Sequence, residues 1–143
     1  MDITYKFVLP NEEIVHLLES LRFDVFDMDK AYLKENETFY EHSLLNGQVY
    51  AFGAFLGEEL LGGCYVSVNL NHLYIDQIFI KRDYQKEKIG GHLLKYVLQR
   101  KGLVEELSGV CLKGVFLDAY YNKQNFYEKL GFKETNGRMH KSF

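Results

Sequence analysis

The sequence is poor in cysteine, has little net charge and contains no long apolar run, and each of these absences excludes a class of protein. Two cysteines, Cys64 and Cys111, are too few for a disulfide framework or a zinc site. A net charge of −3 over 143 residues exerts no general attraction on nucleic acid or anionic lipid, so any anion site has to be local. The longest apolar run, Val49–Leu56, is too short to span a bilayer.

The first residues also lack the features of a secretory signal. The segment "MDITYKFVLP" has neither a basic start nor a long apolar stretch. We therefore expect a cytoplasmic protein that has neither membrane nor nucleic acid among its partners. The chain length and a hydrophobic content of 47% predict one folded domain over residues 1–143. Both cysteines fall in strand-like runs, where we expect buried, structural thiols.

Hydrophobic periodicity predicts strands and helices along the whole chain. Apolar residues recur at every second position in the strand-like segments and at helical spacing in the others. Asn11 is the expected N-cap of the first helix, Gly131 ends the last one, and Asn136-Gly137 is a strong hairpin signal. The expected strands are 3–9, 48–56, 59–68, 72–80, 110–119 and the two arms of the terminal hairpin, and the expected helices lie around 14–21, 27–42, 89–98 and 122–130.

The order of these elements is β-α-α-β-β-β-α-β-α-β-β. Three consecutive strands joined by short turns favour an antiparallel meander, and the strand-helix-strand unit after them favours a parallel crossover. We therefore expect an α/β (mixed α+β) fold, with a central, mixed, mostly antiparallel sheet of about seven strands and helices on both faces. The terminal hairpin would form an edge of the sheet and is a candidate contact for a homodimer.

The segment "YQKEKIGGHLL" (84–94) joins one of these strands to a helix. A helix N-terminus offers unpaired backbone N–H groups and about half a positive charge, and glycine lets a ligand approach the backbone closely. Four cations crowd the same stretch: Lys81, Arg82, Lys86 and Lys88. The composition is consistent with a local phosphate site and equally with a solvated loop of ordinary surface lysines.

The spacing of "IFIKRDYQKEKIGGHLL" resembles the acetyl-CoA signature of the GNAT N-acetyltransferase superfamily. That signature is a strand ending in an apolar triplet, then an aromatic residue, then Arg/Gln-x-x-Gly-x-Gly/Ala at the start of a helix. The triplet is "IFI" (78–80), Tyr84 is the aromatic residue, Gln85 takes the Arg/Gln position and Gly90 takes the last glycine. "NFYEKLGF" (125–132) is similar to a second landmark of the family. The resemblance covers nearly the whole chain and implies the GNAT fold.

The resemblance also implies acetyl-CoA as co-substrate, no metal, and direct transfer of the acetyl group to an amine. Lys88 stands at the position of the first glycine of the signature, and Arg82 stands where a proline is common. A side chain at position 88 could narrow the pyrophosphate loop or place an ammonium group beside the phosphates, while the backbone donors remain. The implied acetyl-CoA contacts are Ile78, Phe79, Ile80, Gln85, Lys86, Glu87, Lys88, Ile89, Gly90, Gly91, Asn122 and Tyr127.

Acetyl transfer needs an acid for the leaving thiolate and donors for the oxyanion. Tyr127 aligns with the tyrosine that the family often uses as this acid; the other interpretation is that it packs in the core. The resemblance implies that the backbone N–H of Ile80 is the oxyanion donor, because the fourth strand of the family carries a bulge and splays from the fifth. Asn122 is expected to cap the last helix, to contact the pantetheine arm, or both.

The reaction also needs a base for the amine, and Asp76 is the expected one. A carboxylate within an apolar strand must face water, a partner or a cleft, because burying it unpaired is costly. Strand periodicity places it on one face with His72, Tyr74, Ile78 and Ile80. The expected role includes orienting a water molecule that accepts the proton. The competing interpretations are that Asp76 binds a cation of the substrate or forms a structural ion pair.

The acceptor is expected to bind around residues 22–42, where acidic side chains outnumber basic ones. This favours a cationic amine, unless the acidic run is only a solvated face. Three functions stay open: transfer to a small amine, transfer to a protein N-terminus or lysine, and acyl-CoA binding without turnover. Lys88 favours the last of these, and Tyr127 and Gln85 argue against it. A Rossmann domain is disfavoured, because "VLPNEE" after the first strand is not a glycine-rich turn.

Overall fold

The computed structural model describes residues 2–26, 30–118 and 124–143, with only the backbone described for residues 30–37. None of the helices in these residues is long and apolar enough to cross a membrane. The elements are β1 (Ile3–Val8), α1 (Glu12–Phe26), α2 (Lys30–Leu45), β2 (Tyr50–Leu56), β3 (Glu59–Asn69), β4 (His72–Ile80), the 3-10 helix η1 (Arg82–Glu87), α3 (Ile89–Gln99), α4 (Lys101–Ser108), β5 (Gly114–Asp118), α5 (Gln124–Lys129), β6 (Lys133–Thr135) and β7 (Arg138–Ser142).

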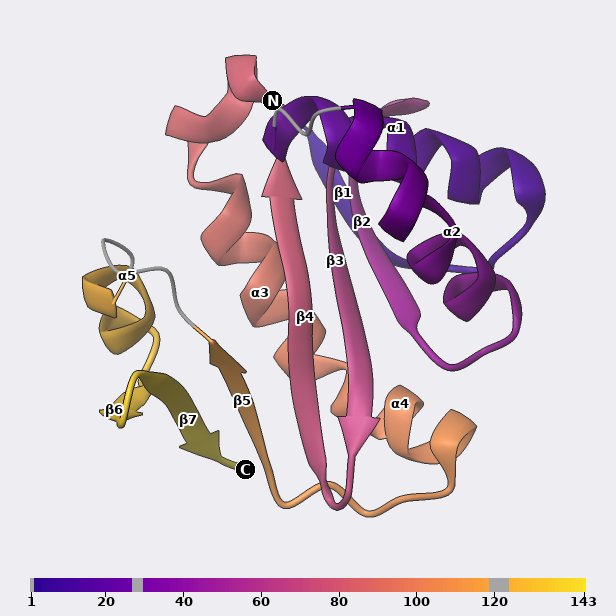
Figure 1. The fold of residues 1–143 in the computed structure, drawn as a ribbon. Helices are drawn as coiled ribbons and strands as arrows, with labels where there is room; N and C mark the ends of the chain where they lie inside the picture. Colours follow the sequence, from indigo (N-terminus) through magenta and orange to yellow (C-terminus); the bar gives the residue numbers. More distant parts are fainter. Residues whose placement is uncertain (1, 27–29, 119–123) are drawn as a thin grey trace.

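The strands of the described residues form one seven-stranded sheet in the order β1-β2-β3-β4-β5-β7-β6 (Figure 1). Neighbouring strands are antiparallel except β4 and β5, which are parallel because the chain crosses over between them. The hairpin of β6 and β7 turns at Asn136 and Gly137, whose φ angles of 53° and 82° are those of a type I′ turn. The predicted mixed, mostly antiparallel fold is confirmed.

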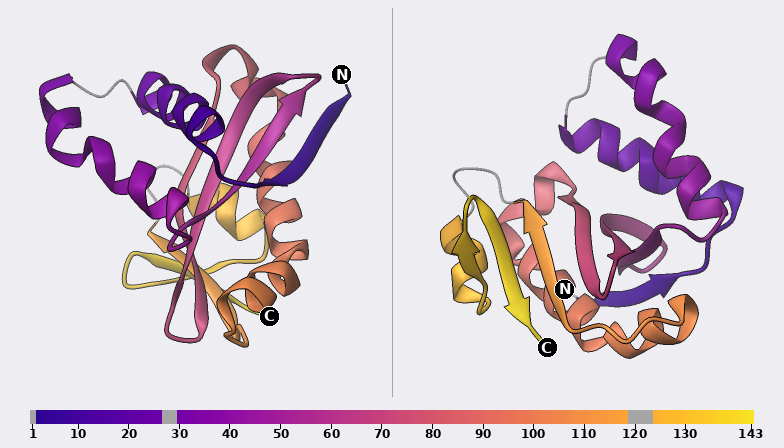
Figure 2. Two further views of the ribbon diagram at one scale, coloured as in Figure 1. Left: turned by 90° about the vertical axis from the view of Figure 1, so that its right-hand side faces the viewer. Right: turned by 60° about the horizontal axis from the view of Figure 1, so that its bottom comes forward.

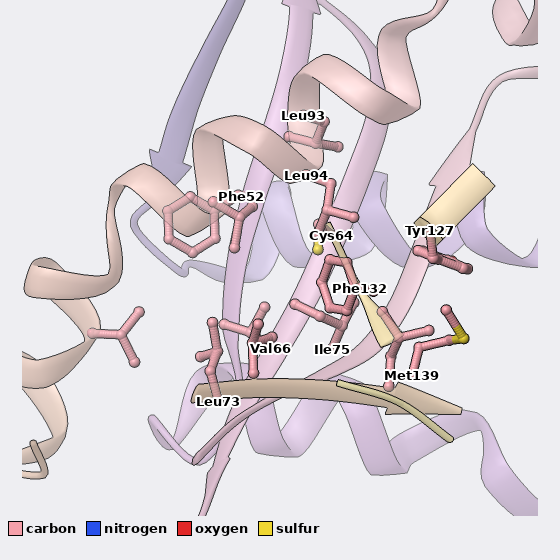
Figure 3. Close-up of a cluster of buried hydrophobic side chains, with 14 of the residues drawn as sticks. Phe52, Cys64, Val66, Leu73, Ile75, Leu93, Leu94, Tyr127, Phe132 and Met139 are labelled. Carbon is pink, nitrogen blue, oxygen red and sulfur yellow. The ribbon is translucent and has the colours of Figure 1, made fainter. Parts of the chain in front are cut away.

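Helices cover both faces of this sheet (Figure 2). On one face, Leu93 and Leu94 of α3 and Val104 of α4 join a fully buried cluster with the sheet (Figure 3). On the other face, Leu18 of α1 and Leu44 of α2 pack in a second cluster. Burying one such leucine contributes about 1.5–3 kcal/mol, so each helix pair is held to the sheet mainly by apolar contacts.

The predicted start of the first helix is confirmed. The backbone N–H of Ile14 donates to the side-chain oxygen of Asn11 at 2.9 Å, which is the N-cap interaction. The connection between β4 and β5 differs from the prediction of one helix, because η1 precedes α3 and α4 follows it. No proline separates α3 from α4, and the chain turns at Arg100 (φ −102°) without a sequence signal that marks the break.

The predicted strand over 110–119 is shorter in the structure, and the expectation for Cys111 is wrong. β5 begins at Gly114, and the preceding residues form a loop in which the Leu112 N–H donates to the Glu105 carboxylate at 2.8 Å. Cys111 lies in that loop and is exposed, whereas Cys64 is buried in β3 as expected. The apolar run from residue 110 to 119 looks continuous in the sequence. Before Gly114, however, the chain does not pair with the sheet, and the Glu105 carboxylate accepts the Leu112 N–H instead.

Candidate active site

β4 and β5 separate toward their C-terminal ends, which leaves a gap in the sheet (Figure 1). The two strands pair only over residues 72–74 and 114–116. Beyond that point β4 continues to Ile80 beside β3, and β5 continues to Asp118 beside β7. This is the splayed arrangement that the family resemblance implied.

β4 also carries a bulge at Asp76. Gln77 lies opposite Tyr65 of β3 and Ile75 lies opposite Val66, so Asp76 has no partner residue in the register. A bulge of this kind inserts one extra residue and re-aims the side chains on either side of it.

The bulge reverses the faces of the strand, so the predicted alternation along β4 is wrong. Ile75, before the bulge, packs in the cluster on the α3 side. Ile78 and Ile80, after the bulge, pack on that same side, whereas Phe79 packs on the α1 side. Asp76 therefore does not share a face with Ile78 and Ile80. A period of two holds only while the ladder is regular, and the extra residue shifts it by one.

A pocket of about 600 Å³ lies in the gap between β4 and β5. Its walls come from β4, from the ends of α1 and β5, from the start of α3, and from α5. The lining residues are Val25, Phe26, Tyr74, Ile75, Asp76, Gln77, Ile78, Phe79, Ile80, Gln85, Lys88, Gly90, Gly91, Leu117, Asp118, Phe126 and Tyr127.

Most of the predicted site residues line this pocket, and a few do not. Lys86 and Glu87 are exposed on η1, away from the pocket lining. Ile89 is buried with 1% of its surface exposed and packs with Ala54 and Leu61, so its side chain anchors α3 to the sheet. Asn122 lies outside the described residues.

The N-terminus of α3 opens onto the pocket. Lys88, the residue before this helix, adopts the left-handed conformation (φ 60°, ψ 19°) that glycine enters more easily. Among the described residues no side chain caps the helix, and its first turn contains no acidic residue. Gly90 and Gly91 line the pocket, and a Cβ atom added to either would only come into ordinary contact with Ile80 or Phe126, at 3.6 Å and 3.7 Å. Uncapped N–H groups at the edge of a pocket fit a phosphate-bearing ligand such as acetyl-CoA.

Backbone groups of β4 also face the gap. The Lys81 N–H donates to the Leu61 carbonyl at 2.7 Å, so Ile80 and Gly62 form a non-hydrogen-bonded pair of the β3–β4 ladder. The N–H and C=O groups of Ile80 therefore point away from β3, toward the side that β5 has left. The carbonyl accepts a hydrogen bond from the Gln85 side chain at 2.9 Å, which closes the turn into η1.

Asp76 is partly buried at the bulge, where the Ser67 hydroxyl donates to its carboxylate at 2.6 Å. Burial raises the pKa of Asp76 to about 6 because it penalises the charged form, and hydrogen bonding from Ser67, with a smaller effect from Tyr40, offsets part of this shift in pKa. A carboxyl group with this pKa is mostly ionised at neutral pH and still able to exchange protons there.

Tyr127 reaches the same pocket from α5. Its side chain is 8% exposed and belongs to the cluster on the α3 side, beside Phe132 (Figure 3). The ring centroids of Tyr127 and Phe132 lie 6.0 Å apart, and those of Tyr127 and Phe126 lie 5.0 Å apart. Tyr127 therefore packs in the core and also lines the pocket, so the two interpretations of this residue are compatible.

Sequence reasoning did not single out Asp118, which also lines the pocket. Its carboxylate accepts hydrogen bonds from the Tyr74 hydroxyl at 3.1 Å and from Arg138 at 3.0 Å. Burial, with the hydrogen bond to Asp118, raises the pKa of Tyr74 to about 12. The signal was present, because Asp118 ends a buried strand that runs parallel to β4, and parallel strands end at the same edge of a sheet.

Comparison with known protein families identifies the class of this protein. The sequence profile of the acetyltransferase (GNAT) domain matches residues 45–134, which is more than half of the chain. The chain therefore belongs to the GNAT acetyltransferase family, a family of acetyl-CoA-dependent enzymes. A comparison with curated proteins finds no match.

Solved structures share the fold over nearly the whole chain. A protein assigned to the GNAT family from Desulfovibrio desulfuricans is similar with a TM-score of 0.78 and 12% identity, over 99% of both chains. NAA60 of Arabidopsis thaliana in complex with acetyl-CoA has a TM-score of 0.74 and 17% identity, over 99% of both chains. The PaiA N-acetyltransferase of Thermoplasma acidophilum in complex with coenzyme A has a TM-score of 0.66 and 18% identity, over 100% of both chains. At these identities the likeness establishes the fold.

Proposed function

We propose that this enzyme moves the acetyl group of acetyl-CoA directly to the primary amine of a small, cationic acceptor. One observation carries the proposal: a single pocket combines the open N-terminus of α3 with Asp76 and Tyr127. The first of these features suits the phosphates of the co-substrate, and the two side chains suit the proton transfers that aminolysis of a thioester requires.

On this proposal the backbone N–H groups at the start of α3 and the Lys88 ammonium group bind the pyrophosphate. The backbone groups of Ile78 and Ile80 that face the gap hold the pantetheine arm. The Ile80 N–H then lies beside the thioester carbonyl, where it stabilises the negative charge that develops on the oxygen. Lys88 adopts a left-handed conformation (φ 60°) that glycine enters easily, so its backbone geometry supports a loop that binds CoA.

The proton transfers follow from the two side chains. Asp76 accepts a proton from the amine as the new C–N bond forms, directly or through a water molecule. The C–S bond then breaks, and Tyr127 gives its proton to the leaving sulfur, so free CoA leaves as the thiol. A carboxyl group with a pKa of about 6 is suited to the first role near neutral pH, because it is mostly ionised and still basic.

The acceptor end of the pocket supports a cationic substrate. Asp76 and Asp118 place carboxylates in the lining, and Val25 and Phe26 add an apolar wall at the end of α1. A site of this kind attracts an ammonium group and covers its alkyl chain. The acidic side chains of residues 27–37 lie outside the described residues and carry no part of this argument.

Release of the CoA thiol from acetyl-CoA, followed against a panel of amines, tests the proposal. The panel contains a polyamine, an aminoglycoside, free lysine and a short peptide with a free N-terminus. We expect turnover with the small polycations and a large loss of it in Asp76→Asn. Preference for the peptide would favour a protein acetyltransferase. CoA binding without turnover on any amine would favour the non-catalytic alternative.

A further inference from the structure

The Asp118 carboxylate is paired with a cation at the edge of the pocket. The Arg138 guanidinium donates to one of its oxygens at 3.0 Å, and the Tyr74 hydroxyl donates to the other at 3.1 Å. Both partners of the ion pair are accessible to solvent, with 53% of the Arg138 side chain and 57% of the Asp118 side chain exposed. An ion pair this exposed contributes little to stability, so it opens at small cost.

Aromatic rings lie beside this ion pair. Tyr74 lies opposite Phe116 in the register of β4 and β5, and their ring centroids are 4.8 Å apart. The Arg138 guanidinium carbon lies 4.6 Å from the centroid of the Phe116 ring. A carboxylate and an aromatic face are the two features that bind ammonium groups in proteins. Arg138 therefore occupies an arrangement of groups that also suits a cation brought by a ligand.

These groups lie on the face of the sheet opposite α3. Val115 and Leu117 of β5 pack in the cluster on the α3 side. Side chains alternate along a strand, so Phe116 and Asp118 point to the other face of β5. Asp118 also belongs to the pocket lining, which places its carboxylate within reach of a molecule bound in the pocket.

Asp76 lies on this same face, across the gap between the strands. Ser67 is opposite Tyr74 in the register of β3 and β4 and shares its face, and the Ser67 hydroxyl donates to Asp76 at 2.6 Å. Asp76 follows Tyr74 by two residues, and Asp118 follows Phe116, the register partner of Tyr74, by two residues as well. The two carboxylates are therefore at the same level, one on each of two strands that separate there.

We propose that Asp118, together with the Tyr74 and Phe116 rings, binds a second cationic group of the acceptor in place of Arg138, while the amine beside Asp76 is acetylated. The inference rests on the proposed function and narrows its substrate class to diamines and polyamines with a short alkyl chain between two nitrogens. Such a molecule contacts both carboxylates at once, whereas a monoamine leaves Asp118 with Arg138. The exchange breaks and forms only non-covalent contacts, so the acetyl transfer itself is unchanged.

Putrescine and butylamine test the proposal, because they have the same alkyl chain and differ by the second amine. Release of the CoA thiol gives kcat and KM for each of them. We expect the wild-type KM to be about tenfold lower for putrescine, which is the effect of one partly exposed charged contact.

Asp118→Asn keeps an oxygen for the Tyr74 hydroxyl and removes the negative charge. It should raise the KM of putrescine about tenfold and leave both kcat and the KM of butylamine unchanged. The matched control is Glu58→Gln, which removes an exposed carboxylate outside the pocket lining and should change neither KM.

Arg138→Gln is expected to act in the opposite direction. Without the guanidinium group no cation has to leave Asp118 before the acceptor binds, so the KM of putrescine should fall roughly threefold. A structural role of the ion pair would make the two variants alike, because either one breaks it. Opposite shifts in KM therefore distinguish a binding role from a structural one.

The NMR signal of the Arg138 Nε–H, assigned with Arg138→Gln, measures the exchange without turnover. We expect putrescine to move this signal in the protein bound to free CoA, and butylamine to leave it in place. A signal that stays in place while putrescine is acetylated would overturn the inference, as would equal changes in both KM values in Asp118→Asn, and the proposed function would stand. A signal that moves although no amine is acetylated would support the cation site and remove the proposed function.

Discussion

The guanidinium group of Arg82 donates a hydrogen bond to the backbone carbonyl of Asp24 at 2.8 Å. Asp24 lies in the last turn of α1, where carbonyl groups have no partner within the helix and where α1 has no basic residue of its own. Arg82 opens η1, which leads to the N-terminus of α3. The bond therefore connects α1, whose last residues line the pocket, to η1, which leads to the proposed binding site of the co-substrate.

Arg82→Ala is expected to lower the free energy of unfolding by about 1 kcal/mol, because a charge-assisted bond to a helix C-terminus is lost. We also expect a higher KM for the amine, because Val25 and Phe26 at the end of α1 line the pocket. Lys81→Ala is the matched control. Its ion pair with Glu59 is exposed and contributes little. Equal effects of the two variants on stability and on KM would contradict the connection between Arg82 and α1.

Lys88→Gly is expected to stabilise the free protein and to weaken its binding of CoA. A lysine in the left-handed conformation costs roughly 1–2 kcal/mol that glycine does not, so the melting temperature should rise. Loss of the ammonium group should lower CoA affinity and flatten its dependence on salt. Calorimetric titrations between low and high salt measure both effects, with Lys86→Ala as a control for a cation outside the pocket lining. Wild-type affinity and salt dependence in Lys88→Gly would exclude a phosphate contact.

Tyr127→Phe is expected to lower kcat about 100-fold or more, which is the usual contribution of a general acid, and to leave CoA binding intact. The phenylalanine ring preserves the contacts with Phe126 and Phe132, so the fold should persist. Release of CoA thiol measures kcat, and a thermal shift with CoA measures binding. Tyr96→Phe, which removes a hydroxyl group outside the pocket lining, serves as the control. Unchanged turnover in Tyr127→Phe would leave that residue with a packing role alone.

Asp76→Asn is expected to stabilise the protein at neutral pH while it removes activity. The pKa of Asp76 rises from 3.8 to about 6 on folding, so the folded state binds more protons than the unfolded state between these values. Stability from this group is therefore present below about pH 4 and is lost as the pH rises through about 6. A pKa shift is equivalent to about 1.4 kcal/mol per pH unit, and partial exposure of Asp76 reduces this value. At pH 7.5 the ionised carboxylate therefore lowers the free energy of unfolding by about 1–3 kcal/mol.

Urea unfolding at pH 4 and pH 7.5 measures this penalty. The amide variant should be more stable than the wild type at pH 7.5, and the difference should shrink at pH 4, where the wild-type carboxyl is protonated. A difference that is the same at both pH values would mean that Asp76 is not held at a raised pKa. A gain in stability with a loss of activity would be the usual trade-off of a functional site.

Much of the fold was predictable because its signals are local. Alternation and helical spacing predicted most of the helices and strands in their order along the chain, Asn11 predicted a helix start, and Asn136-Gly137 predicted a hairpin. Each of these depends on residues within a few positions of one another, whose preferences act before any tertiary contact forms. The junction between β4 and α3 was predictable for the same reason, since a strand end and a helix start define it.

The rest of the site depends on partners far apart in the chain. The bulge at Asp76 arises from pairing with β3, and it moves Ile78 and Ile80 to the face opposite the predicted one. The hydrogen bond from Ser67 to Asp76 joins β3 to β4 and has no counterpart in sequence spacing.

Sequence patterns thus identified the secondary structure, the family signature and the presence of a carboxylate in β4. The register of β3 on β4, the burial that raises the pKa of Asp76 and the hydrogen bond that it accepts from Ser67 came from packing. Periodicity reports which face of an element is apolar, but it carries no information on which distant residue will lie across from it. That choice is made by the combined free energy of many non-local contacts, so it becomes visible only when the chain is folded.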